Sequence, residues 1–205
     1  MPDQDERIKR DLCEAMKDLY SQRLLSDIGG NLSCRSKDQE SIWITPMGVR
    51  KNQVTPEDLL KIAQDGTILV KNKKNLRPSV EFKLHLAIYA EDEDYNAVIH
   101  THGPWSTAFS IAPVHIPPLT HELQILVPDL NETFVTYAPS GSLELASAVS
   151  DIITDSGIAI MQNHGLVTAA STLEHALILT RAVEETIRVY SIARQLGGQI
   201  SSFPD

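Results

Sequence analysis

Three histidines, His100, His102 and His164, constrain this chain more than any other feature of its sequence. Side chains two residues apart on a β-strand point to the same face, and the apolar residues 97–99 predict a strand that leads into the first two histidines. Residues 157–161 predict a second buried strand that leads to the third. If the two strands are neighbours in one sheet, three ring nitrogens meet at their carboxyl ends, which is the ligand set of a catalytic zinc with an open position. Histidines at strand ends are also often hydrogen-bonded residues near a surface, so the spacing alone leaves both interpretations open.

A carboxylate adds to the histidine pattern. Residues 78–89 predict a helix whose first turn carries Glu81, with Ser79 as its N-cap. In that position Glu81 can serve as a base or as a further metal ligand, although the helix dipole alone also favours an acidic residue in a first turn. His85 lies one helical turn further on the same side, where it either orients the carboxylate or is a structural histidine.

The length and composition indicate a single domain that spans residues 1–205. A chain of 205 residues with 42% hydrophobic content can bury one substantial core. No apolar run is long enough to cross a bilayer, and the acidic start of the chain, residues 1–6, lacks the basic region and apolar core of a signal peptide. We therefore expect a cytoplasmic protein with no membrane partner.

The net charge bears on the kind of partner, and the cysteine spacing bears on the state of the thiols. A net charge of −9 argues against nucleic acid, which needs a basic protein surface. The basic residues within 71–77 form either a solvated loop or a local attraction for an anionic substrate. Cys13 and Cys34 belong to no ligand-like cluster, so we expect buried free thiols.

Hydrophobic periodicity predicts a mixed α/β layered domain. The expected helices have an apolar stripe at helical spacing or a start signal, and they cover residues 8–24, a segment starting at 55–58, 78–89, 104–111, a segment from 140–142 to about 153, and 173–190. The expected strands cover residues 31–35 and 41–45, which could pair as a hairpin, and the two that lead to the histidines. On the last helix, Glu184 and Glu185 are interpreted as surface charge, because consecutive residues diverge around a helix.

Five short motifs, in their order and spacing, resemble those of the class II aldolase and adducin family. They are Gly30–Ser33, Thr45–Gly48, Pro78–Glu81, His100–His102 and Asn163–Gly165. The resemblance extends from the first helix to about Leu196, which is nearly the whole chain. Within the family, the length of the chain and the surroundings of His164 are most similar to those of the L-fuculose-phosphate aldolases.

The resemblance implies a three-layer α/β/α fold with a central, mainly antiparallel sheet flanked by helices. It also implies a homotetramer, a ring of four with each active site at a subunit boundary. The implied activity is that of a metal-dependent aldolase, a carbon–carbon lyase. Such an enzyme cleaves a small hydroxy-ketone, for example the sugar phosphate L-fuculose 1-phosphate, into a ketone and an aldehyde through a metal-stabilised enediolate.

The resemblance also assigns roles to the residues of the histidine pattern. His100, His102 and His164 are the implied metal ligands. Glu81 stands at the place of the carboxylate that ligates the metal in the empty site and then acts as acid and base on the substrate. Zn²⁺ is the expected ion, and Mn²⁺, Co²⁺ or Fe²⁺ also suit this ligand set.

At the substrate end, the chain departs from the family's aldolases. Asn31, Gly48 and Ser79 stand where these aldolases place phosphate ligands, and Gly30 lies beside the first of them. Apolar residues stand where hydroxyl side chains are expected: Ile28, Met47 and Val80. Because each charge-assisted hydrogen bond to phosphate contributes roughly 1.5–3 kcal/mol, we expect weaker binding of a phosphate monoester. Either basic residues of 71–77 compensate, or the substrate carries a carboxylate or no anionic group at that end.

A second departure lies in residues 118–123, where the aldolases carry a tyrosine that protonates the aldehyde oxygen and this chain has none. His121 or Glu122 can take that acid/base role, and a glutamate in this region does so in the methylthioribulose-1-phosphate dehydratases of the family. Dehydration is therefore one alternative, and metal-dependent decarboxylation is another. A non-catalytic, adducin-like interaction module is the alternative outside the enzymes, but such members lose the metal ligands that this chain retains.

Overall fold

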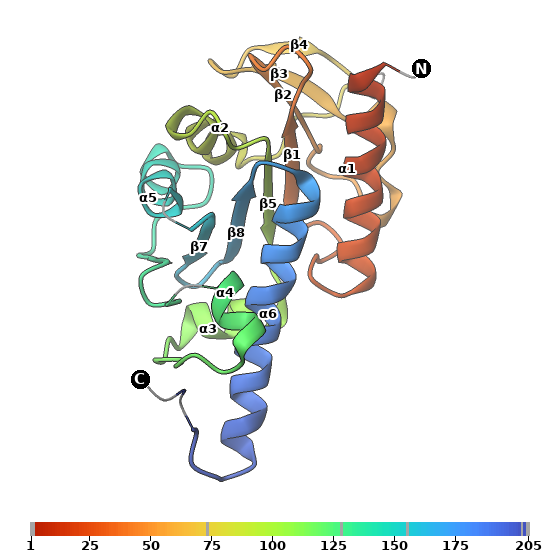
Figure 1. Ribbon diagram of the computed structural model, residues 1–205. Coiled ribbons are helices and arrows are strands. Elements are labelled where there is room, and N and C mark those ends of the chain that lie inside the picture. The colour runs from red at the N-terminus through yellow and green to blue at the C-terminus, as the bar shows by residue number, and fades with distance from the viewer. Residues whose placement is uncertain (1–2, 73, 128, 155, 202, 204–205) are drawn as a thin grey trace.

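The computed structural model describes residues 3–72, 74–127, 129–154, 156–201 and 203, and one eight-stranded sheet forms its centre (Figure 1). The strands are β1 Asn31–Arg35, β2 Ser41–Ile44, β3 Leu60–Ala63, β4 Ile68–Val70, β5 Ala97–Thr101, β6 Phe134–Val135, β7 Ile158–Met161 and β8 Gly165–Ala170. Their order in the sheet is β4-β3-β2-β1-β5-β8-β7-β6. Neighbouring strands are antiparallel except β6 and β7, which are parallel. The predicted mainly antiparallel sheet is confirmed.

Helices cover both faces of the sheet, which gives the expected three layers (Figure 1). The helices are α1 Gln4–Ser21, α2 Phe82–Glu91, α3 Pro104–Ile111, α4 His121–Leu126, α5 Leu143–Ile153 and α6 Leu173–Gln195. One hydrophobic core joins the sheet to α1, α3 and α6, and a second joins its other face to α2 and α5. None of the described helices combines the length and the apolar character needed to cross a membrane.

Strand β5 lies between β1 and β8 and is buried on both faces. Ala97 and Ile99 belong to the core under α1 and α6, whereas Val98 between them belongs to the opposite core. Because both faces are covered, the strand is apolar at every position that precedes the histidines. This packing fixes the backbone from which His100 projects.

Most of the helices and the first hairpin lie where the sequence predicted them. Helix α3 begins at Pro104, and α5 follows the N-cap Ser142, whose hydroxyl accepts a hydrogen bond from the Leu145 N–H at 3.0 Å. Strands β1 and β2 form the predicted hairpin. Cys13 and Cys34 are buried free thiols, as expected.

Two predicted helix starts differ from the structure. Residues 55–58 begin no α-helix: they form the single 3₁₀ turn η2 Pro56–Asp58, closed by a capping box between Thr55 and Asp58, and the chain then enters β3. Helix α2 begins after Glu81, which is its N-cap residue, rather than after Ser79. The Ser79 hydroxyl accepts a hydrogen bond from the Glu81 N–H at 3.3 Å. Glu81 therefore lies in the turn that precedes the helix.

Candidate active site

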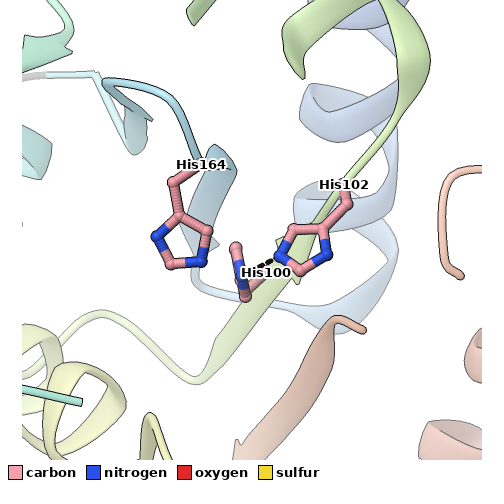
Figure 2. A group of neighbouring side chains, drawn as sticks. All are labelled: His100, His102 and His164. Carbon is pink, nitrogen blue, oxygen red and sulfur yellow. Dashed lines mark hydrogen bonds between the residues drawn. The ribbon is translucent and has the colours of Figure 1, made fainter. Parts of the chain in front are cut away.

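The three histidines converge at one edge of the sheet. Figure 2 shows their side chains gathered around a common space. The ring centroids lie 4.6 Å apart for His100 and His102, 4.9 Å for His100 and His164, and 5.3 Å for His102 and His164. One nitrogen from each ring lies within 4.8 Å of the others. The group is therefore compact enough to hold one metal ion.

The convergence was expected if the two strands that lead to these histidines are neighbours, and they are not. Strand β8 lies between β5 and β7. Because β8 is antiparallel to both, β5 and β7 run in the same direction, and their carboxyl ends reach the same edge of the sheet. The histidines still meet, across one intervening strand.

The tight hairpin between β7 and β8 places His164. Asn163 has a left-handed φ of 56°, a conformation that asparagine tolerates better than most residues. Its N–H donates to the Ser110 carbonyl at 3.1 Å, and the His164 N–H donates to the Met161 carbonyl at 3.1 Å. Glycine then starts β8, so the Asn-His-Gly motif encodes a turn with the histidine at its tip.

The tautomer of His100 follows from its hydrogen bond to the neighbouring strand. Its buried ring donates from Nδ1 to the carbonyl oxygen of Leu166 on β8 at 3.0 Å. Burial lowers the pKa of His100 to about 3, so the ring is neutral near neutral pH. Nε2 therefore presents a lone pair to the cluster, as a metal-ligating nitrogen does.

The carboxylate of Glu81 faces the histidines. Its two oxygens lie 3.2 Å from Nε2 of His100 and 3.2 Å from Nε2 of His164. Asn31 Nδ2 and Ser140 Oγ each donate to one of these oxygens at 2.9 Å. Burial opposes ionisation, but the hydrogen bonds from His164 and the Asn31 amide hold the pKa of Glu81 below its usual range. Glu81 is therefore an ionised carboxylate in a largely buried site.

This donor set fits a divalent metal ion. Nε2 of His100 faces both an oxygen of Glu81 and, at 2.8 Å, Nε2 of His102. A proton on His102 satisfies one of these contacts and leaves the other repulsive, whereas a metal ion between the groups satisfies both. Imidazole and carboxylate ligands suit Zn²⁺, Mn²⁺, Co²⁺ and Fe²⁺. His100, His102 and His164 are the residues that could hold such an ion, with Glu81 as an additional ligand.

A buried hydrogen bond partner sets the orientation of Asn31. Asn31 on β1 lies directly opposite His100 on β5, so both side chains point to the same face of the sheet. The amide nitrogen of Asn31 donates to Glu81, and its amide oxygen contacts Nε2 of His85. An amide oxygen only accepts, so His85 donates from Nε2. His85 therefore acts on Glu81 through Asn31.

The hydrogen bonds beyond His85 have a fixed direction too. Nδ1 of His85 must accept, because burial lowers the pKa of this histidine to about 3 and the neutral ring has one proton. Ser33 Oγ donates to this nitrogen at 2.6 Å, and Tyr89 Oη donates to Ser33 at 2.9 Å. Every hydrogen bond in the chain therefore runs toward the Glu81 carboxylate.

The loops that carry the predicted substrate-binding residues are joined to one another. A backbone bridge between Pro46 and Pro78 links the loop of Gly48, which is exposed, to the loop of Ser79, which is buried. Gly30 has a φ of 87°, and a Cβ there would lie 2.9 Å from the His100 carbonyl oxygen. Glycine at this position therefore permits the close approach of two backbones.

The three apolar residues of these loops are exposed. The exposed fraction is 74% for Ile28, 41% for Met47 and 54% for Val80. None of them belongs to either hydrophobic core. Their apolar surfaces are therefore available to a substrate or to a neighbouring subunit.

The structure does not bring His121 and Glu122 to the histidine cluster. Both are exposed on α4, where Nδ1 of His121 contacts Nε2 of Gln124 at 3.2 Å. No hydrogen bond or ion pair between described residues connects either of them to the three histidines.

The prediction that Glu184 is a surface charge is wrong. Its carboxylate is 5% exposed and accepts hydrogen bonds from the N–H groups of Trp105 at 3.1 Å and Ser106 at 3.0 Å, at the start of α3. A Cβ on Gly103 would lie 2.2 Å from this carboxylate, so a side chain there would displace it. Glu184 therefore fixes the turn that directly follows His102.

Sequence reasoning also missed Ser140 and Lys51. Ser140, which was interpreted as part of a helix start, donates to Glu81. Lys51 lies in the 3₁₀ turn η1 Lys51–Gln53 and is 2% exposed. Its position shortly after the Thr45–Gly48 motif is the one signal in the sequence that could have indicated it.

Comparison with known proteins agrees with this geometry. The family model of the Class II Aldolase and Adducin N-terminal domain matches residues 10–191. An L-fuculose phosphate aldolase of Methanococcus maripaludis is 37% identical over 178 residues, which cover 87% of this chain and 93% of that protein. A 5-methylthioribulose-1-phosphate/5-deoxyribulose-1-phosphate aldolase of Escherichia coli O45:K1 is 32% identical over 187 residues, 90% of this chain and 84% of that protein.

Solved structures agree as well. An L-fuculose 1-phosphate aldolase has a TM-score of 0.86 and 25% identity, with 97% of this chain and 91% of that chain covered. The fold and the site thus define a class. The protein is an α/β protein with a mainly antiparallel sheet flanked by helices, and its histidine cluster could hold a metal ion. The match over most of the chain is more specific: the chain belongs to the class II aldolase and adducin family, as its motifs predicted.

Proposed function

We propose that this protein is a metal-dependent aldolase, which cleaves a small hydroxy-ketone into a ketone and an aldehyde. The observation that carries the proposal is the convergence of three imidazole rings with Glu81, whose oxygens lie 3.2 Å from two of the ring nitrogens. A divalent ion held by these histidines, zinc in the first instance, supplies a Lewis acid for the negative charge that develops on the substrate oxygens. Sugar 1-phosphates such as L-fuculose 1-phosphate are candidate substrates, in line with the names of the relatives.

The chain's own residues supply the proton chemistry and the binding surface. Glu81 accepts a proton from the substrate and returns it, because an ionised carboxylate can act as base and then as acid. Asn31 and Ser140 keep its oxygens directed at the site. The second N–H of the Asn31 amide, together with the backbone at Gly30 and Gly48 and the hydroxyl of Ser79, is available to the far end of the substrate.

The positions of His121 and Glu122 support a ring of four subunits. Both are candidate acids, yet both are exposed on α4 and have no interaction with the histidines of their own chain in the described structure. In a homotetramer with sites at the subunit boundaries, α4 of one subunit supplies this acid to its neighbour. Sedimentation of the purified protein tests the assembly.

The test of the proposal combines metal analysis with turnover. Wild-type protein is expected to bind about one divalent ion per chain and to release an aldehyde from fuculose 1-phosphate, ribulose 1-phosphate or an unphosphorylated hydroxy-ketone. The His100→Ala variant should keep its circular dichroism spectrum and lose the metal. His175→Ala, which changes an exposed histidine on α6, is the matched control and should retain both. Wild-type protein that takes up no metal would indicate an adducin-like module.

Dehydration of methylthioribulose 1-phosphate is the second candidate function. It is favoured by the absence of a tyrosine in residues 118–123 and by the exposed carboxylate of Glu122. Glu122→Gln should abolish a dehydratase but only slow an aldolase whose proton shuttle is Glu81. Metal-loaded protein that releases carbon dioxide from a sugar acid, and no aldehyde, would instead indicate a decarboxylase.

A further inference from the structure

Lys51 is a buried cation that has no role in the proposed proton transfer. Its side chain is 2% exposed, although lysine is almost never fully buried without a partner. Its backbone N–H donates to the Asp27 carbonyl at 3.1 Å, which joins the loop after Gly48 to the loop that carries Ile28. Lys51 therefore lies at the junction of two loops that carry predicted substrate-binding positions.

The Lys51 ammonium has no counterion in the described part of the chain. None of the hydrogen bonds or ion pairs among the described residues includes its Nζ. Among the described residues, the side-chain nitrogen and oxygen atoms that are fully buried and have no hydrogen-bond partner belong to Trp43, Asp58, Thr101 and Thr107. Lys51 is not one of these, so its ammonium keeps a contact with solvent while its stem is buried. Such a group is available to a bound anion.

The ammonium lies within electrostatic reach of the histidine cluster. Burial lowers the pKa of Lys51 to about 8, and the charge of Glu81 acts in the opposite direction. Burial is also the main cause of the lowered pKa of His102, and the charge of Lys51 contributes to it. The loop to which the Lys51 backbone is bonded also lies against the cluster, because a Cβ on Gly29 would lie 2.5 Å from Nδ1 of His102.

The basic residues of 71–77 offer no comparable group among those described. Lys71, Lys74 and Arg77 are exposed, and the ammonium of Lys74 lies 2.7 Å from the carboxylate of Asp58. Exposed cations in high-dielectric surroundings attract an anion only weakly, whereas a desolvated cation attracts it more strongly. Lys51 is thus a better anion ligand than the loop that the sequence suggested.

We propose that Lys51 binds the anionic group of the substrate, a phosphate monoester or a carboxylate, beside the metal-ligating histidines. This inference rests on the proposed aldolase function and names the anion-binding residue of the same site. A charge-assisted hydrogen bond from a buried ammonium changes affinity roughly 10- to 150-fold. That is enough to replace about one of the three hydroxyl donors that are absent at Ile28, Met47 and Val80.

Three aldol donors that differ in one group test whether Lys51 acts on the anionic group of the substrate. Dihydroxyacetone is neutral, dihydroxyacetone phosphate carries a phosphate, and hydroxypyruvate carries a carboxylate, and all three contain the same hydroxy-ketone. Condensation of each with glycolaldehyde is compared for wild type, Lys51→Met and Lys51→Arg. Lys83→Met, which removes an exposed lysine two residues after Glu81, is the matched control.

Lys51→Met is expected to lower kcat/KM for the preferred charged donor roughly 10- to 150-fold, mainly through KM, and to leave the neutral donor within about threefold. Lys51→Arg should recover part of the loss, and Lys83→Met should behave as wild type. Whether dihydroxyacetone phosphate or hydroxypyruvate shows the effect identifies the anion. An equal loss with the neutral donor, or no loss with either charged donor, overturns the proposal.

Anion binding without turnover keeps this test independent of the proposed function. Inorganic phosphate and pyruvate are titrated calorimetrically into the zinc-loaded wild-type and Lys51→Met proteins. Weaker binding of one anion to the variant supports the role of Lys51 even if no donor is turned over, in which case only the aldolase proposal fails. Equal binding to both proteins, or no binding to either, overturns the role of Lys51.

Discussion

At the scale of single residues, the state of Glu81 depends on side chains that are not themselves proposed as metal ligands. One oxygen of its carboxylate accepts from Asn31, and the direction of that bond is set by the buried donors behind it, His85, Ser33 and Tyr89. If His85 no longer donates, the Asn31 amide is free to rotate and can turn its oxygen toward the carboxylate. Loss of this positioning therefore changes the pKa of Glu81 as well as the orientation of its carboxylate.

The variant His85→Phe tests this positioning effect. We expect kcat to fall about tenfold, which corresponds to about 1.4 kcal/mol. The Asn31 hydrogen bond lowers the pKa of Glu81, so its loss raises that pKa. Since Glu81 must be ionised to accept a proton, the acidic limb of the kcat profile should move to higher pH. Rates measured across the acidic range check this expectation.

Tyr89→Phe is the control for His85→Phe. It removes the outermost donor, and Ser33 can still donate to His85. We expect a loss of about 1 kcal/mol in the free energy of unfolding, with little change in kcat or its pH profile. If the two variants have the same profile, the chain only stabilises the fold, and the positioning role of His85 is wrong.

At the scale of secondary structure elements, α6 fixes the start of α3. The Glu184 carboxylate accepts from the part-buried N–H of Trp105 and the buried N–H of Ser106. Burial raises the pKa of Glu184, and these hydrogen bonds oppose the rise. The residue before this helix is Gly103, which follows His102 directly. The contact between the two helices therefore supports His102, one of the proposed metal ligands.

Substitution of Glu184 should affect stability and metal affinity together. Glu184→Ala leaves the buried Ser106 donor unpaired, at about 1–3 kcal/mol, and the part-buried Trp105 donor as well, whereas Glu184→Gln keeps one acceptor oxygen and should cost less. Glu185→Ala is the control: the side chain of this residue is 44% exposed and pairs with Arg188 at 2.5 Å, as expected for surface charge. Urea unfolding and zinc titration measure the two effects. A Glu184→Ala protein as stable as Glu185→Ala contradicts the proposed contact.

Elements with strong local signals were predictable from the sequence. Helices α3 and α5 begin at a proline and at a capping serine, and their starts are determined within a few residues. The 55–58 segment was predicted wrongly because a capping box closes a single 3₁₀ turn as well as it starts a helix. The order of the strands was not predictable, since the insertion of β8 between β5 and β7 depends on pairing rather than on either segment alone.

In the candidate site, too, some features were predictable from the sequence and others were not. The convergence of His100, His102 and His164 was predictable because each lies at or just after the end of a buried strand, and the direction of those strands fixes the shared edge. Lys51 and the buried contact of Glu184 were not, because neither residue belongs to a motif. Their roles arise from packing between segments that are distant in the sequence.

At the scale of the whole molecule, a metal ion would join segments that the chain separates widely. His100 lies in β5 in the middle of the sheet, His102 directly follows that strand, and His164 lies in the hairpin between β7 and β8. Without an ion, the lone pair of His100 faces the ionised carboxylate of Glu81 at 3.2 Å, which is repulsive. Metal binding should therefore stabilise the native state by adding ligand bonds and by removing this repulsion.

We expect chelation to lower the Tm of the protein. A ligand present at a thousand times its Kd stabilises the native state by about 4 kcal/mol, and 1 kcal/mol corresponds to about 2–4 °C for a chain of this size. Removal of zinc with a chelator should thus lower the Tm by roughly 10 °C. Calorimetry with and without chelator measures this difference.

The His100→Ala variant distinguishes a metal site from a merely polar cluster. It removes both a ligand and the repulsion with Glu81, so its Tm should lie above that of the chelated wild type or close to it, and should not respond to zinc. His175→Ala should show the full response of wild type, because its side chain is exposed on α6. A wild-type Tm that is unchanged by chelator and by added zinc would mean that the three histidines hold no metal. In that case, proton sharing among the rings would have to account for their close approach.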